Sequence, residues 1–151
     1  MITKNVRQYF QKLNSILKET DAVYSAYAKK SGLSESAFWL MYALYEAKRS
    51  CTQKEVGDQW SISKQTINSA MKWLEKNGYV ALTASETDKR GKYITLTEKG
   101  TIFAQKNIAI VFEAEQIAFE QLSETEHIVL IDANQKYLEL LQKEMEQYLQ
   151  K

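Results

Sequence analysis

The sequence predicts a mainly α-helical protein that carries one small β-hairpin. Proline is absent and glycine occurs only five times in 151 residues, so little in the chain interrupts a helix. Apolar residues recur at helical spacing towards both ends of the chain, whereas their period changes to two between residues 79 and 97. With 44% apolar and 26% charged residues, the composition is that of a folded globular chain of about one domain.

The N-terminal part of the chain predicts two amphipathic helices. The first ends near Gly32, and its apolar positions are Val6, Phe10, Leu13, Leu17, Tyr24 and Tyr27. Ser34 is suited to cap the second helix, residues 35–47, because its hydroxyl can accept a hydrogen bond from the first turn. Phe38, Met41 and Tyr42 recur at helical spacing, so we expect this second helix to be largely core.

Two short helices joined by a tight turn are predicted between residues 52 and 77. Thr52 and Glu55 form a capping-box pattern that begins the first of them, residues 52–59. Ser63 is a good cap for the second, and Gly78 is expected to end it with a positive φ. Such a pair predicts a helix-turn-helix.

A β-hairpin is predicted directly after these helices. Residues 79–83 and 93–97 alternate between apolar and less apolar side chains, as half-buried strands do. The polar loop between them is too long for a tight turn and carries Asp88, Lys89, Arg90 and Lys92. The predicted fold class is therefore mainly α with a small β-hairpin wing, which is a winged helix-turn-helix.

The chain from Glu98 onwards is predicted to be helical again. One apolar stripe consists of Phe103, Ile110, Val111, Ala114, Ile117 and Leu122, and a second capping box follows at Ser123 and Glu126. Leu138, Leu141, Met145 and Tyr148 then repeat at coiled-coil-like intervals. We therefore predict that residues 1–33 and 101–151 form a helical dimerisation region around a lobe of residues 34–100, which makes the protein a homodimer. The alternative is one closed helical bundle per chain.

Positive charge is concentrated in the middle of the chain. The net charge is +1 overall, but the balance is +2 over residues 1–47, +4 over residues 48–100 and −5 over residues 101–151. The basic middle segment contains the helix-turn-helix, which favours a nucleic-acid partner for that segment.

The fourth predicted helix presents one polar face without a carboxylate before Glu75. Ile67, Ala70, Met71 and Leu74 turn towards the core. The remaining positions are Ser63, Lys64, Gln65, Thr66, Asn68, Ser69 and Lys72, followed by Lys76. Gln and Asn can pair with adenine, Ser and Thr can bond bases or phosphates, and Lys neutralises phosphate, so this face predicts contacts in a DNA major groove. The alternative is a module that recognises protein, which would favour aromatic residues over lysines.

Asp88 and Arg90 suggest how the wing contributes. A carboxylate that holds one edge of a guanidinium fixes where the rest of it points, and arginine is suited to a narrow minor groove. The alternative is an ordinary surface ion pair.

The motifs in this order resemble the MarR family of bacterial transcriptional regulators. The matching runs are Thr52–Val56, Ser61–Ile67, Leu74–Val80, Asp88–Arg90 and Ile94–Gly100. The resemblance implies a triangular homodimer that binds a pseudo-palindromic operator, with Ser63–Lys72 in the major groove and Arg90 in the minor groove. It also implies a repressor that is released by a small anionic, often phenolic, effector between the dimerisation helices and the DNA-binding lobe.

An effector pocket and a redox thiol are the remaining site hypotheses. Tyr24, Tyr27, Trp39 and Tyr42 could line an aromatic pocket, or they could simply be core. Cys51, the single cysteine, is either a sensor thiol near Arg49 or a small half-buried residue at a turn.

The sequence does not predict an enzyme. The sole histidine, His127, has no nucleophile at a recognisable spacing, and no glycine-rich loop is suited to cradle phosphate. One histidine and one cysteine are too few for a zinc site, which leaves only a carboxylate-rich metal site open, and we expect no cofactor. The chain has no signal-peptide pattern and no long apolar run, so we expect a cytoplasmic protein without a membrane partner.

Overall fold

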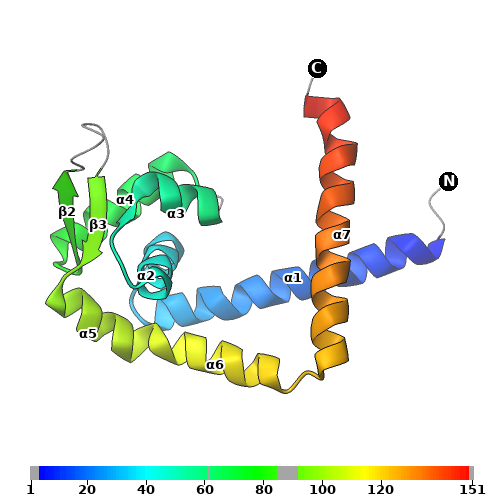
Figure 1. Ribbon diagram of the computed structural model, residues 1–151, viewed down its shortest axis with the longest axis horizontal. Coiled ribbons are helices and arrows are strands. Elements are labelled where there is room, and N and C mark those ends of the chain that lie inside the picture. Colours follow the sequence, from blue (N-terminus) through cyan, green and yellow to red (C-terminus); the bar gives the residue numbers. More distant parts are fainter. Residues whose placement is uncertain (1–3, 61, 85–91, 150–151) are drawn as a thin grey trace. The chain divides into compact units, whose positions relative to one another are not determined.

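The structure is a computed structural model that describes residues 4–60, 62–84 and 92–149, and it divides into two compact units (Figure 1). The first unit ends at Ala109 and the second begins at Ile110. The first unit contains helices α1 (Lys4–Lys30), α2 (Glu35–Ala47), α3 (Gln53–Trp60), α4 (Lys64–Lys76) and α5 (Glu98–Asn107), and strands β1 (Cys51–Thr52), β2 (Val80–Ala84) and β3 (Lys92–Leu96). Two further helices follow, α6 (Ala109–Glu120) and α7 (Glu124–Leu149). The prediction of a mainly α-helical winged helix-turn-helix is confirmed.

Local capping sets the helix boundaries close to where the sequence predicted them. Ser34 Oγ accepts a hydrogen bond from the Ala37 N–H at 3.2 Å and begins α2. Gly32 and Gly78, which follow α1 and α4, have φ angles of +79° and +76°. Both glycines adopt the left-handed conformation that disfavours a Cβ atom, so they end the two helices as expected.

The sheet has three antiparallel strands in the order β1-β3-β2. The predicted hairpin is present, with β2 and β3 paired from Val80↔Leu96 to Ala84↔Lys92, one residue away from the expected bounds. The short strand β1 was not predicted, because Thr52 was interpreted as the first residue of a helix that in fact begins at Gln53. A strand of two residues is too short to show an alternation of apolar and polar side chains in the sequence. Strand β1 is defined by its pairing with β3, in which Cys51 lies opposite Ile94.

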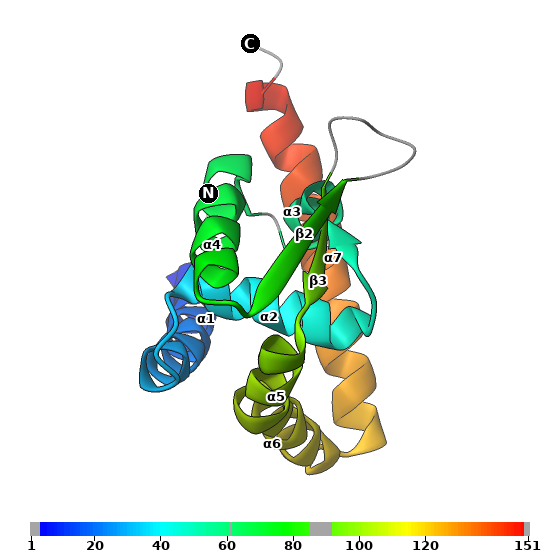
Figure 2. The same ribbon diagram turned by 90° about the vertical axis from the view of Figure 1, so that its left-hand side faces the viewer.

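Helix α2 forms the centre of the first unit. Its Phe38, Leu40 and Met41 are 0% exposed, as are Leu74 of α4 and Ile94 of β3. The expectation that α2 is largely core is therefore confirmed. Helix α4 packs against α2 and α3 and is followed directly by β2, so the polar face of α4 and the hairpin belong to one compact body (Figure 2).

A tight corner joins the two helices of the second unit. The predicted capping box is present, since Glu126 accepts from the Ser123 N–H at 2.8 Å and Ser123 Oγ accepts from the Glu126 N–H at 3.3 Å. His127 Nε2 lies 2.6 Å from the Phe119 carbonyl oxygen, and the two rings stack with centroids 4.5 Å apart. These contacts of His127 with Phe119 hold the end of α6 against the first turn of α7.

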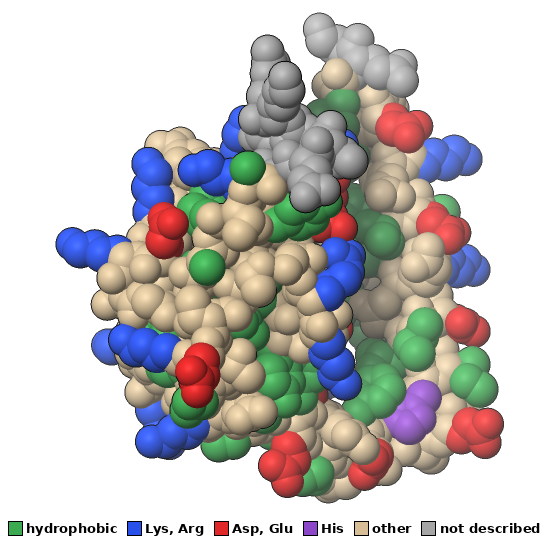
Figure 3. Space-filling view, turned by 60° about the vertical axis from the view of Figure 1, so that its left-hand side comes forward, with side chains coloured by type: hydrophobic (Ala, Val, Ile, Leu, Met, Phe, Trp, Pro, Cys, Tyr) green, Lys and Arg blue, Asp and Glu red, His purple; other side chains and the backbone are tan. Residues whose placement is uncertain are grey.

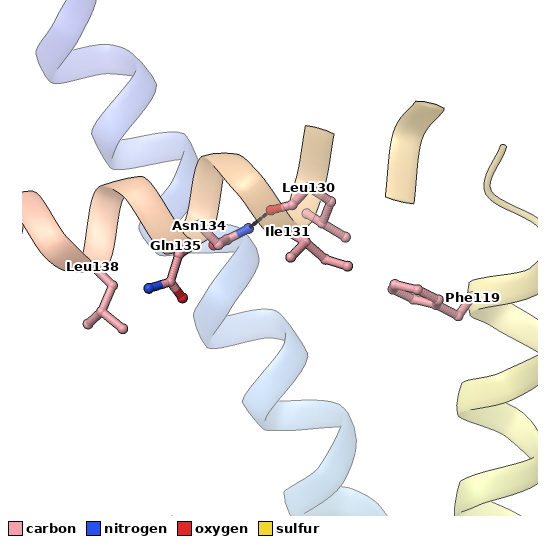
Figure 4. Close-up of a pocket in the computed structure, with 6 residues that line it drawn as sticks. All are labelled: Phe119, Leu130, Ile131, Asn134, Gln135 and Leu138. Carbon is pink, nitrogen blue, oxygen red and sulfur yellow. Dashed lines mark hydrogen bonds between the residues drawn. The ribbon is translucent and has the colours of Figure 1, made fainter. Parts of the chain in front are cut away.

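Helix α7 leaves its apolar side chains exposed. None of its described residues is buried. Phe119, Leu130, Ile131 and Leu138 line a groove of about 350 Å³ in the second unit together with Asn134 and Gln135, and the Asn134 amide donates to the Leu130 carbonyl beside it (Figure 4). The single stripe predicted over residues 103–122 needs one correction, because a turn at Ile108 separates α5 from α6.

The junction between β3 and α5 requires a glycine at position 100. Thr97 caps α5, accepting from the Gly100 N–H at 3.0 Å, and the Thr97 N–H donates to the Tyr79 carbonyl oxygen at 3.1 Å. A Cβ atom on Gly100 would lie 1.8 Å from that oxygen and 2.8 Å from the Tyr79 carbonyl carbon. Backbone atoms on both sides make this approach rigid.

We expect Gly100→Ala to lower the free energy of unfolding by about 3 kcal/mol or more, because the added methyl group forces two backbone segments apart. Urea unfolding followed by circular dichroism measures this change. Gly32→Ala is the matched control. It has nothing within 4 Å of its Cβ position and only the left-handed φ to accommodate, at about 1 kcal/mol. Equal losses for the two variants would contradict the steric explanation.

Candidate nucleic-acid interface

Four buried side chains fix the orientation of helix α4. Ile67, Ala70, Met71 and Leu74 are each at most 4% exposed, which confirms the predicted core face. At the start of the helix, Ser63 Oγ accepts from the Thr66 N–H at 3.2 Å and lies 2.7 Å from the Thr66 hydroxyl. The opposite face of α4 is therefore held towards solvent.

That outer face carries the side chains predicted to enter a major groove. Ser63, Lys64, Gln65, Thr66, Ser69 and Lys72 are exposed, and Asn68 is half-buried. Among the described residues of α4, Glu75 is the only acidic one. Lys and Arg side chains also predominate over acidic ones on the part of the first unit that faces the viewer in Figure 3. The structure thus brings these residues together on one face, and their contact with DNA stays a prediction.

Three hydroxyl groups on this face already have local partners. Ser63 and Thr66 are engaged with each other in the helix cap, and the Ser69 hydroxyl donates to the Gln65 carbonyl at 3.1 Å. Gln65, Asn68 and the lysines remain the side chains best suited to reach a base edge or a phosphate.

Only part of the predicted wing site can be described. Lys92 is exposed at the first position of β3, where it pairs with Ala84. Asp88, Lys89 and Arg90 lie outside the described residues, so their proposed arrangement stays a prediction.

The two helices of the helix-turn-helix are joined by contacts that the sequence did not reveal. The Gln53 carboxamide donates to the Lys64 carbonyl oxygen at 3.0 Å, linking the first turns of α3 and α4. A Cβ atom on Gly57 would lie 3.2 Å from Ile67 Cδ1, so α3 and α4 pack closely. A glutamine in the first turn of a helix is too common for its sequence position to have indicated this role.

The start of α3 is fixed by a capping box with an added arginine. Glu55 accepts from the Thr52 N–H at 2.6 Å, and Thr52 Oγ1 accepts from the Glu55 N–H at 3.1 Å. Arg49 Nη2 lies 3.0 Å from the other Glu55 oxygen. The Thr52 backbone N–H, and after it the Arg49 side chain, hold the pKa of Glu55 below its ordinary value. The capping box was predicted, but the part played by Arg49 was not.

An aromatic cluster joins α1, α2 and α3. The ring of Trp39 lies 5.0 Å from Tyr24, 5.4 Å from Tyr42 and 5.1 Å from Trp60, measured between centroids. Tyr27 lies beside Phe38 instead and donates its hydroxyl to the Asn107 carbonyl at 2.9 Å. The structure thus adds Trp60, the last residue of α3, to the predicted aromatic set.

One polar atom in this aromatic cluster has no partner. Trp60 Nε1 is buried and makes no hydrogen bond, the only such side-chain atom found in the part of the chain that the structure describes. A buried N–H without an acceptor is costly and therefore needs an explanation.

Cys51 is buried in β1 at 5% exposure. Its burial raises the pKa of the thiol, with the nearby Arg49 acting in the opposite direction. The thiol therefore stays protonated at neutral pH, which supports the structural interpretation of this residue over a reactive thiolate.

Within residues 4–60, 62–84 and 92–149, no three His, Cys, Asp or Glu side chains are grouped so as to hold a metal ion. No helix in those same ranges has the length and apolar character needed to span a bilayer.

Comparison with known proteins identifies a matching family. Residues 31–91 match the model of the MarR family. The HTH-type transcriptional regulator PrsX of Escherichia coli is 32% identical over 76 residues, which cover 50% of this chain and 46% of PrsX. The chain spans about half the length of the curated relatives it matches.

Solved structures share the fold over most of the chain. A MarR family regulator from Neisseria meningitidis superimposes with a TM-score of 0.77 at 23% identity, covering 97% of this chain and 99% of that protein. A MarR family transcriptional regulator from Streptomyces coelicolor, solved in complex with DNA, superimposes with a TM-score of 0.78 at 21% identity, covering 94% and 91%.

The capping box at α3 generates a pH-dependent prediction. The pKa of Glu55 is lower in the folded state than in the unfolded state. Its contribution to the stability of the fold is therefore fully present above the pKa of the unfolded state and is lost as the pH falls through the pKa of the folded state. We expect Glu55→Ala to reduce stability by about 1 kcal/mol at neutral pH, most of it from the lost cap because solvent screens the arginine contact.

The difference from the wild type should shrink as the pH falls through the lowered pKa of Glu55, because below that pKa the wild type also lacks the ionised carboxylate. Urea midpoints across this pH range measure it, with Glu113→Ala on α6 as the control for removing an exposed carboxylate. A constant difference at all pH values would show that the charge of Glu55 is not involved.

Proposed function

The chain belongs to the MarR family through its matched segment, residues 31–91, and from that premise we propose that it is a sequence-specific DNA-binding transcriptional regulator. The observation that carries the proposal is the outer face of α4, which is polar, basic and free of carboxylates before Glu75. Four buried residues on the opposite side hold this face outwards, so the side chains are presented on a rigid element.

The proposed docking places α4 in a major groove. Gln65 and Asn68 would read base edges, since a carboxamide can bond both the N6 and N7 atoms of adenine. Lys64 and Lys72 would neutralise phosphates. The wing, including Lys92 at the start of β3, would contact the adjacent backbone, with Arg90 in the minor groove.

We propose that the regulator acts as a homodimer on a pseudo-palindromic operator. Helix α7 exposes the seam of Leu138, Leu141, Met145 and Tyr148, each between 42% and 66% exposed. Helix α1 likewise exposes Val6, at 57%, and Val23, at 68%. Apolar surfaces of this extent on two long helices are typical of an interface between subunits, and a two-fold axis would match two operator half-sites.

We further propose that the protein represses transcription and is released by a small anionic or phenolic effector at the aromatic cluster of Tyr24, Trp39, Tyr42 and Trp60. The buried Trp60 N–H supports this assignment, because an oxygen of such an effector could accept its hydrogen bond. Tyr27, which lies one helical turn from Tyr24 and packs beside Phe38, would form part of the same effector site.

A mobility-shift titration of the full chain on a duplex selected from a random-sequence library tests DNA binding. The logarithm of the affinity should fall linearly with the logarithm of the salt concentration. Lys72→Gln should weaken binding and reduce the magnitude of that slope by about 0.9, the value for one lost phosphate contact.

Lys18→Gln, an exposed lysine on α1, is the matched control and should leave the slope unchanged. A salt-independent affinity, or a slope that Lys72→Gln does not alter, would instead favour a surface that recognises protein.

The dimer interface is tested by a charge placed in the α7 seam. We expect Leu141→Glu, or removal of residues 126–151, to give monomers or aggregates, because either change disrupts the exposed apolar seam. Sedimentation velocity measures the oligomeric state. Lys143→Glu, also exposed on α7 but off the seam, should keep the dimer. A soluble dimer of the shortened chain that still binds DNA would place the interface elsewhere.

A further inference from the structure

A cavity of about 420 Å³ lies in the first unit where α2 leads into β1. Its walls come from the end of α2, the connection to β1, the end of β3 and the start of α5, and they consist of Leu44, Tyr45, Lys48, Arg49, Ser50, Thr95, Leu96 and Thr101. None of these residues belonged to a predicted site. The volume lies within the range of small-molecule sites.

The lining combines two cations with hydroxyl groups and apolar walls. Lys48 and Arg49 supply positive charge, and none of the described residues that line the cavity is a carboxylate. Ser50 Oγ and Thr95 Oγ1 lie 2.6 Å apart, so one of the two hydroxyl groups donates a hydrogen bond to the other. The proton of the accepting hydroxyl group can then be donated to a ligand. Leu44 and Leu96 provide the apolar surface. We propose that this cavity binds a small amphipathic carboxylate, with its anionic group at Lys48 and Arg49 and its apolar body against the two leucines.

The backbone at Lys48 supports a binding role for this corner. Lys48 terminates α2 with φ +53°, the only positive φ at a non-glycine residue in the described part of the chain. Glycine is the usual residue at such a helix end because a Cβ atom is disfavoured there. A lysine in this conformation places a cation at the rim of the cavity at a cost in backbone strain.

Arg49 connects the cavity to the start of α3. Arg49 Nη2 donates to Glu55 Oε1 at 3.0 Å, and Arg49 Nη1 donates to the Ser50 carbonyl oxygen at 2.8 Å. The guanidinium is largely exposed, so a carboxylate in the cavity competes with Glu55 for it. We expect binding to weaken the contact between Arg49 and Glu55, while Glu55 retains its bonds to Thr52. Occupancy of the cavity and the arginine contact at the α3 cap thus draw on the same guanidinium charge.

Benzoate serves as the probe, and neutral benzamide is its isosteric control. In NMR titrations of the full chain, benzoate should shift the amide signals of Ser50, Thr95 and Thr101 saturably. Benzamide should bind about tenfold more weakly, because charge-assisted hydrogen bonds to Lys48 and Arg49 are lost.

Variants at Lys48 and Arg49 should weaken the binding of benzoate by about as much as replacing benzoate with benzamide does. Lys48→Asn and Arg49→Gln remove the charges, and Asn tolerates the left-handed conformation. Lys106→Gln, exposed on the same helix as Thr101, is the control and should bind benzoate as the wild type does. Equal binding of benzoate and benzamide, or variants at Lys48 and Arg49 that bind like Lys106→Gln, would overturn the proposal.

Glu55→Gln distinguishes competition for Arg49 from a purely structural effect. Glutamine preserves the capping box but removes the charge that holds Arg49. We expect benzoate affinity to rise by about threefold, the range of an exposed ion pair. A weakened or unchanged affinity in this variant would refute the competition. None of these readouts involves DNA, so the outcome is separate from that of the proposed regulatory function.

Discussion

The burial of one side of α4 is the constraint on which the rest of the structure depends. Ile67, Ala70, Met71 and Leu74 pack against α2 and α3, and a helix held by four side chains at successive turns cannot rotate about its axis. Every exposed side chain of α4 inherits its direction from that packing. The polar face is therefore a consequence of the core, and a change of core volume beneath α4 would move the whole surface that is proposed to meet DNA.

Polar contacts at the helix ends complete this positioning. Ser63 begins α4, Gln53 joins its first turn to α3, and the Tyr79 carbonyl fits against Gly100 where α5 leaves the sheet. The Ser63 cap satisfies a backbone N–H that has no partner within the helix, and the other two contacts fix how α3 meets α4 and how the sheet meets α5. The hairpin and α4 consequently form one body, as is required if both are to contact the same DNA duplex.

Three features of the described residues each correspond to a proposed partner. The apolar seam of α7 lies exposed, the Trp60 N–H has no acceptor among the described residues, and the corner cavity holds two cations without a lining carboxylate. A second copy of the chain, an effector oxygen and a small carboxylate would satisfy them in turn. Arg49 gives the last of these a physical link to α3, because its guanidinium contacts Glu55 and also lines the cavity.

The sequence by itself determined the helices, their caps, the hairpin and the polar face of α4, because these follow from local patterns, namely contacts between residues three or four positions apart in helices and the alternation of side chains in strands. Ser34, the Thr52–Glu55 box and the Ser123–Glu126 box could all be recognised for that reason. Only the tertiary structure decided the strand β1, the Gln53–Lys64 bond, the inclusion of Trp60 in the aromatic cluster and the cavity at Lys48. These features bring together segments distant in sequence, and such contacts arise when elements pack, so no local pattern specifies them.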